Sequence, residues 1–302
     1  MADGAGPTAG SVAALSDAVR RGDRGAVERS LDALVTEHRF TIAVVFPAVG
    51  AVSLLASAEG LLPPPLAFNP LFVLFGVLVM RLPLVAGLFP LVGRKAAAIL
   101  AALTAYAYGI ELVGVRTGWP YGEFSYGVDL GPMLLGEVPI GLPVFFFPLV
   151  LNSYLLVLLL AGDRARSTPL RLLATVATVI ATDLVLDPGA VAIGFWAYVD
   201  GGAIYGVPLS NYAGWVLSAT VATVGFDLAF PREGVLDRLD SCPFMLDDLV
   251  SFVILWGTIN AVYANWASVA LAGLFGAGLL ATDRFDFAVG DSRVVAAVRE
   301  LR

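Results

Sequence analysis

The sequence predicts an all-α integral membrane protein, a polytopic bundle of transmembrane helices, and three observations support this prediction. The 302-residue chain is 58% hydrophobic with a mean hydropathy of +0.84, and only 14% of its residues are charged, whereas soluble domains carry about 25%. Several apolar stretches reach the roughly 20 residues that a helix needs to cross a bilayer. Most Lys and Arg residues fall in alternate connecting segments, which is typical of multi-pass proteins.

Residues 1–39 form a polar segment that we expect on the cytoplasmic side, near the membrane surface. Its apolar residues are spaced for short amphipathic helices, and they are Leu15, Val19, Val27, Leu31 and Leu34. No apolar region with a cleavage site opens the chain, so we do not expect a signal peptide.

Seven apolar regions follow, with approximate bounds 40–59, 69–91, 95–115, 138–161, 169–190, 208–230 and 249–281. Arg81 and Pro83 interrupt the second region, which indicates a kinked helix whose arginine snorkels or pairs. The last region has 33 residues. It would form about 50 Å of helix, too long for one crossing of a roughly 30 Å core unless strongly tilted.

The distribution of positive charge indicates the topology. With the N-terminus inside, 16 of the 18 Lys and Arg residues lie in inside segments, and Arg116 alone lies in an outside loop. The positive-inside rule therefore places both termini in the cytoplasm, which requires an even number of crossings. We accordingly divide 249–281 near Asn260–Asn265. The result is a 40–281 bundle of about eight crossings with a cytoplasmic tail at 282–302; seven crossings and an outside tail are the alternative.

Several classes of function are excluded by composition. The chain has one cysteine, Cys242, and one histidine, His38, so disulfides, Cys–His zinc sites, His-centred triads and His-clustered di-iron sites are not expected. Acid–base chemistry must then fall to Asp, Glu, Tyr or water. The net charge of −7 argues against nucleic acid as a partner. Lys95 is the single lysine. A deficit of lysine with a negative net charge resembles proteins of high-salt organisms, although a GC-rich genome also lowers the lysine content.

Asp183 and Asp187 are the leading candidates for catalysis. They are spaced i, i+4 and therefore share one helix face. In a low-dielectric site two such carboxyl groups repel each other, so at least one is expected to stay protonated near neutral pH. The protonated group could donate a proton while its ionised neighbour orients water. The alternative is a structural pair satisfied by Arg116 or by tyrosine hydroxyls.

Other polar residues are predicted on the same, outer side of the membrane. They are Glu59, Glu111, Arg116, Trp119, Tyr121, Glu123, Tyr126, Tyr205 and Asn211. Arg116 is expected to meet Asp183, Asp187 or Glu123, or else Glu111 and Arg116 serve in an interfacial ion pair that holds a loop. Asn152 and Asn260 are expected to form interhelical hydrogen bonds, and Asp227, near the inner end, to face water.

Two sequence blocks resemble a known family. The first is ELVGVRTGWPYG at 111–122, followed by Tyr126 and LGP at 130–132. The second is DLVLDPGAV at 183–191, followed by GFW at 194–196, YGVPLSN at 205–211 and GW at 214–215. Together these blocks resemble the integral-membrane carotenoid hydratases of bacteria and haloarchaea. The resemblance is close over 110–215 and loose over 40–281, and it does not extend to 1–39.

The resemblance implies addition of water to a terminal isoprenoid double bond of a long acyclic carotenoid. In the haloarchaeal branch, which makes bacterioruberin, this forms tertiary alcohols on a fifty-carbon chain. The reaction needs a proton donor, a stabilised tertiary carbocation and water, but no metal, flavin or nicotinamide. Our hypothesis is that Asp183 or Asp187 donates the proton, with Glu111 as the next candidate. Tyr121, Glu123, Arg116 and Asn211 would hold water and tune the acid.

The expected partners are a lipophilic carotenoid, membrane lipid and, as a further expectation, other membrane enzymes of the same pathway. Two other functions stay open. In a membrane prenyltransferase, the D-x-x-x-D of Asp183 and Asp187 would hold Mg²⁺ against a diphosphate. The second acidic site that such enzymes need is missing from this side, because Asp247 and Asp248 are predicted on the opposite one. The other function is carotenoid binding or transport without catalysis, although the polar groups crowd one side rather than the midplane.

Overall fold

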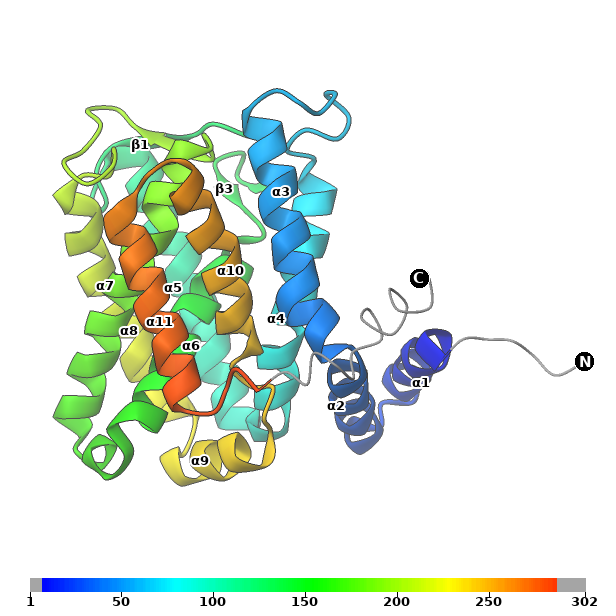
Figure 1. Ribbon diagram of the computed structural model, residues 1–302. Coiled ribbons are helices and arrows are strands. Elements are labelled where there is room, and N and C mark those ends of the chain that lie inside the picture. Colours follow the sequence, from blue (N-terminus) through cyan, green and yellow to red (C-terminus); the bar gives the residue numbers. More distant parts are fainter. Residues whose placement is uncertain (1–6, 287–302) are drawn as a thin grey trace, which may run out of the picture.

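Long apolar helices run alternately up and down in the computed structural model, which describes residues 7–286 (Figure 1). The first half comprises α1 (Pro7–Arg21), α2 (Arg24–Phe40), the π-helical turn η1 (Thr41–Val45), α3 (Phe46–Ala58), α4 (Pro70–Leu88), η2 (Phe89–Leu91), α5 (Arg94–Thr117) and three short strands, β1 (Phe124–Tyr126), β2 (Met133–Leu134) and β3 (Val138–Pro139). The second half comprises α6 (Leu142–Ala161), η3 (Gly162–Arg166), α7 (Thr168–Ala192), β4 (Trp196–Tyr198), α8 (Leu209–Ala229), α9 (Arg232–Ser241), α10 (Asp247–Val262) and α11 (Trp266–Ala281).

The predicted all-α membrane bundle is confirmed. In the described part of the chain, five helical segments are long and apolar enough to cross a membrane, namely Arg24–Ala58, Pro70–Leu91, Arg94–Thr117, Leu142–Arg166 and Thr168–Ala192. The pair α8 and α9, bent by 83°, makes a sixth if it is one span. The predicted count of eight is not confirmed, because α10 and α11 have only 16 residues each.

The predicted division of 249–281 is confirmed. Helix α10 ends at Val262 and α11 begins at Trp266, and the chain turns between them through Ala264, whose φ is 57°. The expected amphipathic helices near the N-terminus also exist, as α1 and α2. Helix α2 continues through η1 into α3, so the helix runs across the boundary that the sequence predicts at residue 39.

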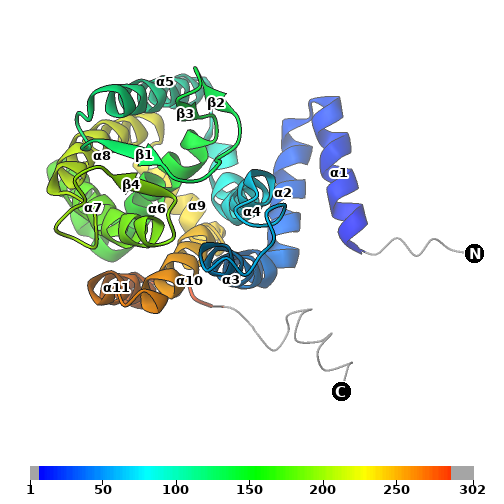
Figure 2. The ribbon, with the colours of Figure 1, turned by 90° about the horizontal axis from the view of Figure 1, so that it is seen from above.

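The bundle has two distinct ends. We call the end that carries residues 59–69, 118–141 and 193–208 the β end, and the opposite end, with residues 230–246, the α9 end (Figure 1). At the β end, β1 pairs antiparallel with β4, and β2 with β3. Seen from above, β1 and β4 lie over the group formed by α5, α6, α7 and α8 (Figure 2). The β1–β4 pairing therefore joins the two sequence blocks that carry the family resemblance.

Helix α6 is the central helix of the bundle. It is apolar on every face, and its side chains are buried without interruption from Pro148 to Leu158. Burial all round is typical of a helix surrounded by other helices. The first turns of α6, nearer the β end, are only half-buried, and this is the part that borders the cavity described next.

Candidate active site

A cavity of about 130 Å³ lies within the β end, among α5, α6, α7, α8 and the strands β1 and β4. The lining residues with carboxyl, hydroxyl or amide groups are Glu111, Tyr121, Tyr126, Asp187, Tyr198 and Asn211. The apolar lining residues are Ala107, Ile110, Phe124, Leu130, Pro139, Leu142, Phe145, Phe146, Leu149, Leu186, Phe195, Trp196, Trp215 and Trp256. A mostly apolar cavity with a few converging polar groups is the usual form of a small-molecule site.

Asp187 presents a carboxyl group to this cavity from α7. Its Oδ2 accepts a hydrogen bond from Nδ2 of Asn211, at 2.6 Å, and another from the hydroxyl of Tyr198, at 3.0 Å. Both of these bonds end on the same oxygen. The carboxyl group is thereby oriented by neutral donors from α8 and β4, and no ion pair to it exists among residues 7–286.

Asp183 lies one helical turn away and is fully buried, but it does not line the cavity. Its Oδ2 accepts a hydrogen bond from the same Asn211 Nδ2, at 3.0 Å. Its Oδ1 is buried without a hydrogen-bond partner in the described structure. The predicted shared helix face is confirmed, and one amide group joins the two carboxyl groups. Only Asp187 can touch a molecule in the cavity.

A proline break fixes the backbone around Asp187. Pro188 has no N–H, so the carbonyl of Leu184 lacks its helical partner, and the hydroxyl of Ser268 donates to that carbonyl at 2.7 Å. Nδ2 of Asn260 donates to the carbonyl of Val185 at 2.7 Å. The predicted interhelical hydrogen bonding of Asn260 is confirmed. Ser268 of α11 thus replaces the helical hydrogen bond that α7 loses at Pro188, and Asn260 of α10 adds a hydrogen bond to the next carbonyl.

Glu111 supplies the second carboxyl group of the cavity, from α5. The hydroxyl of Tyr126 donates a hydrogen bond to it. Burial, followed by the nearby charge of Glu111, raises the pKa of the Tyr126 phenol. Burial and then the charge of Asp187 raise the pKa of the Tyr198 phenol in the same way. Both phenols therefore stay protonated and act as donors to the two acids.

Tyr121 is a further polar residue of the cavity lining. Its hydroxyl lies 2.6 Å from Oγ of Ser218 on α8. The ring packs directly on Gly214, where an added Cβ would lie 2.5 Å from Cδ1 of Tyr121. A larger residue at 214 would displace the ring, and this explains the small residue in the GW pair of the second sequence block.

Aromatic rings make up much of the apolar lining. The rings of Phe146 and Trp215 are stacked, with centroids 5.7 Å apart, and those of Phe195 and Trp256 meet edge to face at 6.3 Å. Aromatic faces attract cations through their quadrupole. The cavity thus brings together carboxyl groups and π-faces.

Besides Asp183, five residues predicted for the site do not line the cavity, and they are Glu59, Arg116, Trp119, Glu123 and Tyr205. Glu59 accepts a hydrogen bond from the Tyr263 hydroxyl, and the Tyr205 hydroxyl accepts one from the backbone of Ala267. Trp119 is 59% exposed, and Glu123 is exposed as well. These residues lie in or against the loops of the β end.

The expected pairing of Arg116 with Asp183, Asp187 or Glu123 is wrong. Arg116 instead pairs with Glu137, with Nη2 lying 2.7 Å from Oε1. The reason is its position in the last turn of α5, half-exposed, beside the loop that joins β2 and β3. The pair lowers the pKa of the Glu137 carboxyl and ties this loop to α5.

Sequence reasoning missed Tyr198 and Trp256. Tyr198 reaches Asp187 only because β4 pairs with β1, and the alternation Trp196–Ala197–Tyr198 after the second block was the available signal for a strand. Trp256 comes from α10, far from both blocks, and no sequence pattern marks it as part of the site.

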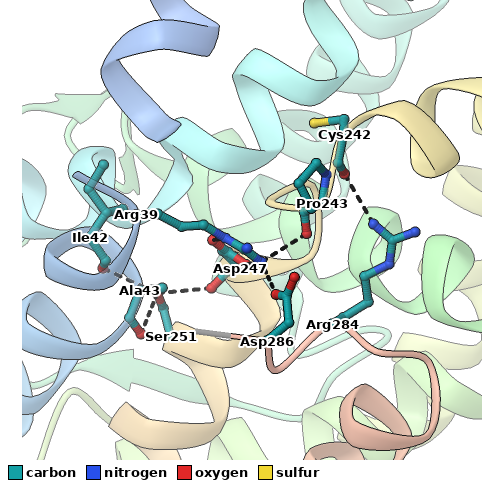
Figure 3. Close-up of polar contacts among 9 residues, drawn as sticks. All are labelled: Arg39, Ile42, Ala43, Cys242, Pro243, Asp247, Ser251, Arg284 and Asp286. Carbon is teal, nitrogen blue, oxygen red and sulfur yellow. Dashed lines mark hydrogen bonds and ion pairs between the residues drawn. The ribbon is translucent and has the colours of Figure 1, made fainter. Parts of the chain in front are cut away.

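A second set of buried acids lies toward the α9 end, and each has an arginine partner. Nε of Arg39 lies 2.6 Å from Oδ2 of Asp247, and Arg39 also pairs with Asp286 (Figure 3). Arg81 pairs with Asp248, which confirms that this arginine has a partner. These pairs link α2, α4 and α10.

Asp227 does not face water as predicted. It lies in the last part of α8, and its Oδ1 is 2.6 Å from Nε of Arg171 on α7. Tyr154 of α6 also donates its hydroxyl to this carboxylate, at 2.8 Å. The α9-end acids thus join helices through cations, which the acids of the cavity do not do.

The fold and the site together define an integral membrane protein with an acid-bearing, aromatic-lined cavity suited to an apolar molecule. Residues 68–279 match the carotenoid biosynthesis protein family, and the chain belongs to this family. The bisanhydrobacterioruberin hydratase of Haloarcula japonica is 72% identical over 267 residues, which cover 88% of this chain and 91% of that protein. No solved structure matches the chain. The resemblance predicted from the two sequence blocks is confirmed.

Proposed function

We propose that the protein is a carotenoid hydratase, a carbon–oxygen lyase that adds water to terminal isoprenoid double bonds of an acyclic carotenoid. The substrate is of the fifty-carbon type, and the products are tertiary alcohols, as in bacterioruberin biosynthesis. The observation that carries this proposal is the carboxyl group of Asp187, which lines a mostly apolar cavity in a chain 72% identical to a named hydratase.

The reaction proceeds in two steps. Asp187 donates its proton to the less substituted carbon of the double bond, whose electron pair forms the new C–H bond. The tertiary carbon becomes a cation, and the faces of Trp215 and Trp256 together with nearby carboxylate charge stabilise it. Water then forms the C–O bond and releases a proton to the Glu111 carboxylate. The proton on Glu111 then returns to Asp187 through water, so the net change is one molecule of water added.

The neutral hydrogen-bond donors around the two acids support the roles of Asp187 as proton donor and Glu111 as proton acceptor. Asn211 and Tyr198 both bind Oδ2 of Asp187, which leaves Oδ1 as the oxygen to meet the substrate. Tyr126 orients Glu111 in the same manner. Tyr121 borders the space between the two acids and can hold the attacking water. Water is the only co-substrate in this mechanism, and no cofactor is required.

We place the protein in the cell membrane as a multi-pass protein with a cytoplasmic N-terminus, which follows from the positive-inside rule. The β end would then face outward, where one end of a long carotenoid reaches water. Its partners are the carotenoid, membrane lipid and other membrane enzymes of the pathway, and not nucleic acid. A prenyltransferase is not favoured, because Asp183 does not reach the cavity and so cannot share a magnesium ion there with Asp187.

The test is pigment mass analysis. The gene is deleted in its host, and in parallel it is added to cells that make the anhydro carotenoid. Deletion should lead to species that lack one or two waters, and the wild-type gene should restore the hydrated pigment. An unchanged pigment profile would overturn the proposal. Pigment that co-purifies with the protein in stoichiometric amount but is never hydrated would instead support a binding protein.

A further inference from the structure

Asp183 has no role in the mechanism above, although it is the more deeply buried of the two α7 acids. A buried carboxyl group without a cationic partner is costly in a bundle of this kind, and an intramembrane acid is a functional candidate by default. Since Asp183 does not line the cavity, it cannot act on the substrate directly. Any effect of Asp183 on the reaction must therefore act through the residues that it contacts.

The one group that it touches by hydrogen bond is the amide of Asn211. Nδ2 of Asn211 carries two hydrogens, and one goes to Asp183 while the other goes to Asp187. A planar amide with both hydrogens engaged has a single orientation. Asp183 therefore fixes Asn211, and Asn211 in turn fixes Oδ2 of Asp187.

The surroundings of the two acids argue against a role for Asp183 that depends on its negative charge. The other titratable groups that face the two acids are Glu111 from α5, Tyr121 and Tyr198 from the β end, and Tyr212 from α8. The tyrosines are neutral, and Glu111 adds a further negative charge when it is ionised. No arginine or lysine is paired with either acid within residues 7–286. Two carboxylates in such surroundings cannot both be ionised cheaply.

We propose that Asp183 is a positioning residue, whose Oδ2 orients the amide of Asn211 and, through it, the carboxyl group of Asp187. This inference rests on the proposed hydratase function. It assigns the two acids of the D-x-x-x-D unequal tasks, since Asp187 transfers the proton and Asp183 holds the amide that orients Asp187.

The experiment separates the charge of Asp183 from its shape. Asp183→Asn keeps the size and an acceptor oxygen but removes the charge, while Asp183→Leu removes both. Hydration of the anhydro carotenoid is measured in isolated membranes across pH. In Asp183→Asn, hydration should stay close to that of the wild type across the profile, because the amide oxygen can still accept a hydrogen bond from Asn211. In Asp183→Leu, which has no acceptor, hydration should fall by on the order of 10²-fold at every pH while the protein still accumulates in the membrane.

Thr223→Val is the matched control, because Thr223 is a buried hydroxyl on α8 with no hydrogen-bond partner in the described structure. Its profile should coincide with that of the wild type. Equal losses of hydration in Asp183→Asn and Asp183→Leu, or full hydration in Asp183→Leu, would overturn the proposal. If Asp183→Asn does not accumulate in the membrane, Asp183→Ser is the second neutral variant with an acceptor oxygen, and its hydration should exceed that of Asp183→Leu. Wild-type membranes that hydrate nothing would instead refute the hydratase function itself.

Discussion

The two sets of buried acids differ in what neutralises them. Around the cavity at the β end, the carboxyl groups of Asp183, Asp187 and Glu111 receive hydrogen bonds from an amide and from phenols. Toward the α9 end, Asp227, Asp247 and Asp248 are each paired with an arginine. An arginine partner favours the ionised form of a carboxyl group, whereas neutral donors leave the group freer to gain and lose a proton. The first set is suited to proton transfer, and the second joins helices.

The side-chain contacts at the α9 end support a structural role for its acids. Arg39 contacts Asp247, the carbonyl of Pro243 and Asp286, and so joins α2 to the segments on either side of α10 and α11 (Figure 3). Ser251 lies within 3.5 Å of the carbonyl oxygens of Ile42 and Ala43 in the π-helical turn. Each of these contacts ties one segment to another.

The largest effect should come from removing the proton donor. Asp187→Asn keeps the shape of the side chain, so the helix bundle should form normally. Hydration should fall about 10²- to 10⁴-fold, as is usual for the loss of a general acid. Pigment mass analysis and the amount of protein in the membrane would be measured together. Substantial hydration by this variant would contradict the role of Asp187.

Breaking a pair of the other set should affect stability rather than chemistry. Arg81→Met leaves Asp248 buried with only Asn152 as a donor, and loss of one partner of a buried pair costs about 3–5 kcal/mol. Thermal unfolding of the detergent-solubilised protein is the measurement. The double variant Arg81→Met, Asp248→Leu should recover much of the loss, because it leaves no unpaired charge. Arg166→Met, in the exposed pair with Asp163, is the control and should unfold like the wild type.

A smaller effect is expected at the proline break of α7. Ser268→Ala leaves the Leu184 carbonyl without its side-chain donor, and such interhelical hydrogen bonds contribute about 0.6 kcal/mol on average and at most about 1.7 kcal/mol. Because this carbonyl lies beside Asp187, the rate of hydration should fall by more than the loss of thermal stability alone would cause. Thr104→Ala, which removes a hydroxyl that bonds within its own helix α5, is the control. Equal losses in both variants would show that the α10–α11 donors do not position the acid.

The smallest effect should come from the surface pair of Arg116 and Glu137, which keeps the pKa of Glu137 below its ordinary value. A lowered folded-state pKa contributes stability at neutral pH, which disappears as the pH falls through that pKa. Arg116→Ala should therefore change thermal stability only slightly near pH 7 and not at all in acid. A large loss of hydration in this variant would mean that Arg116 acts on the cavity acids after all.

The sequence predicted what depends on local pattern and could not predict what depends on packing. Apolar length located the helices, and the i, i+4 spacing placed Asp183 and Asp187 on one face. Which of them reaches the cavity depends on how α7 is rotated against α8, and this is set by many contacts at once. The partner of Arg116 is in a loop whose path has no periodic signal. Tyr198 enters the site only through the pairing of two three-residue strands.

The short α10–α11 hairpin has a consequence for the surrounding lipid. Sixteen residues make a helix of about 24 Å, less than the hydrocarbon thickness of about 30 Å. Such hydrophobic mismatch is relieved when the bilayer thins locally. Trp256 of this hairpin forms part of the cavity wall. Lipid headgroups and their hydration layer would then lie closer to the cavity. Water would have a shorter path to a substrate in the hydrocarbon core.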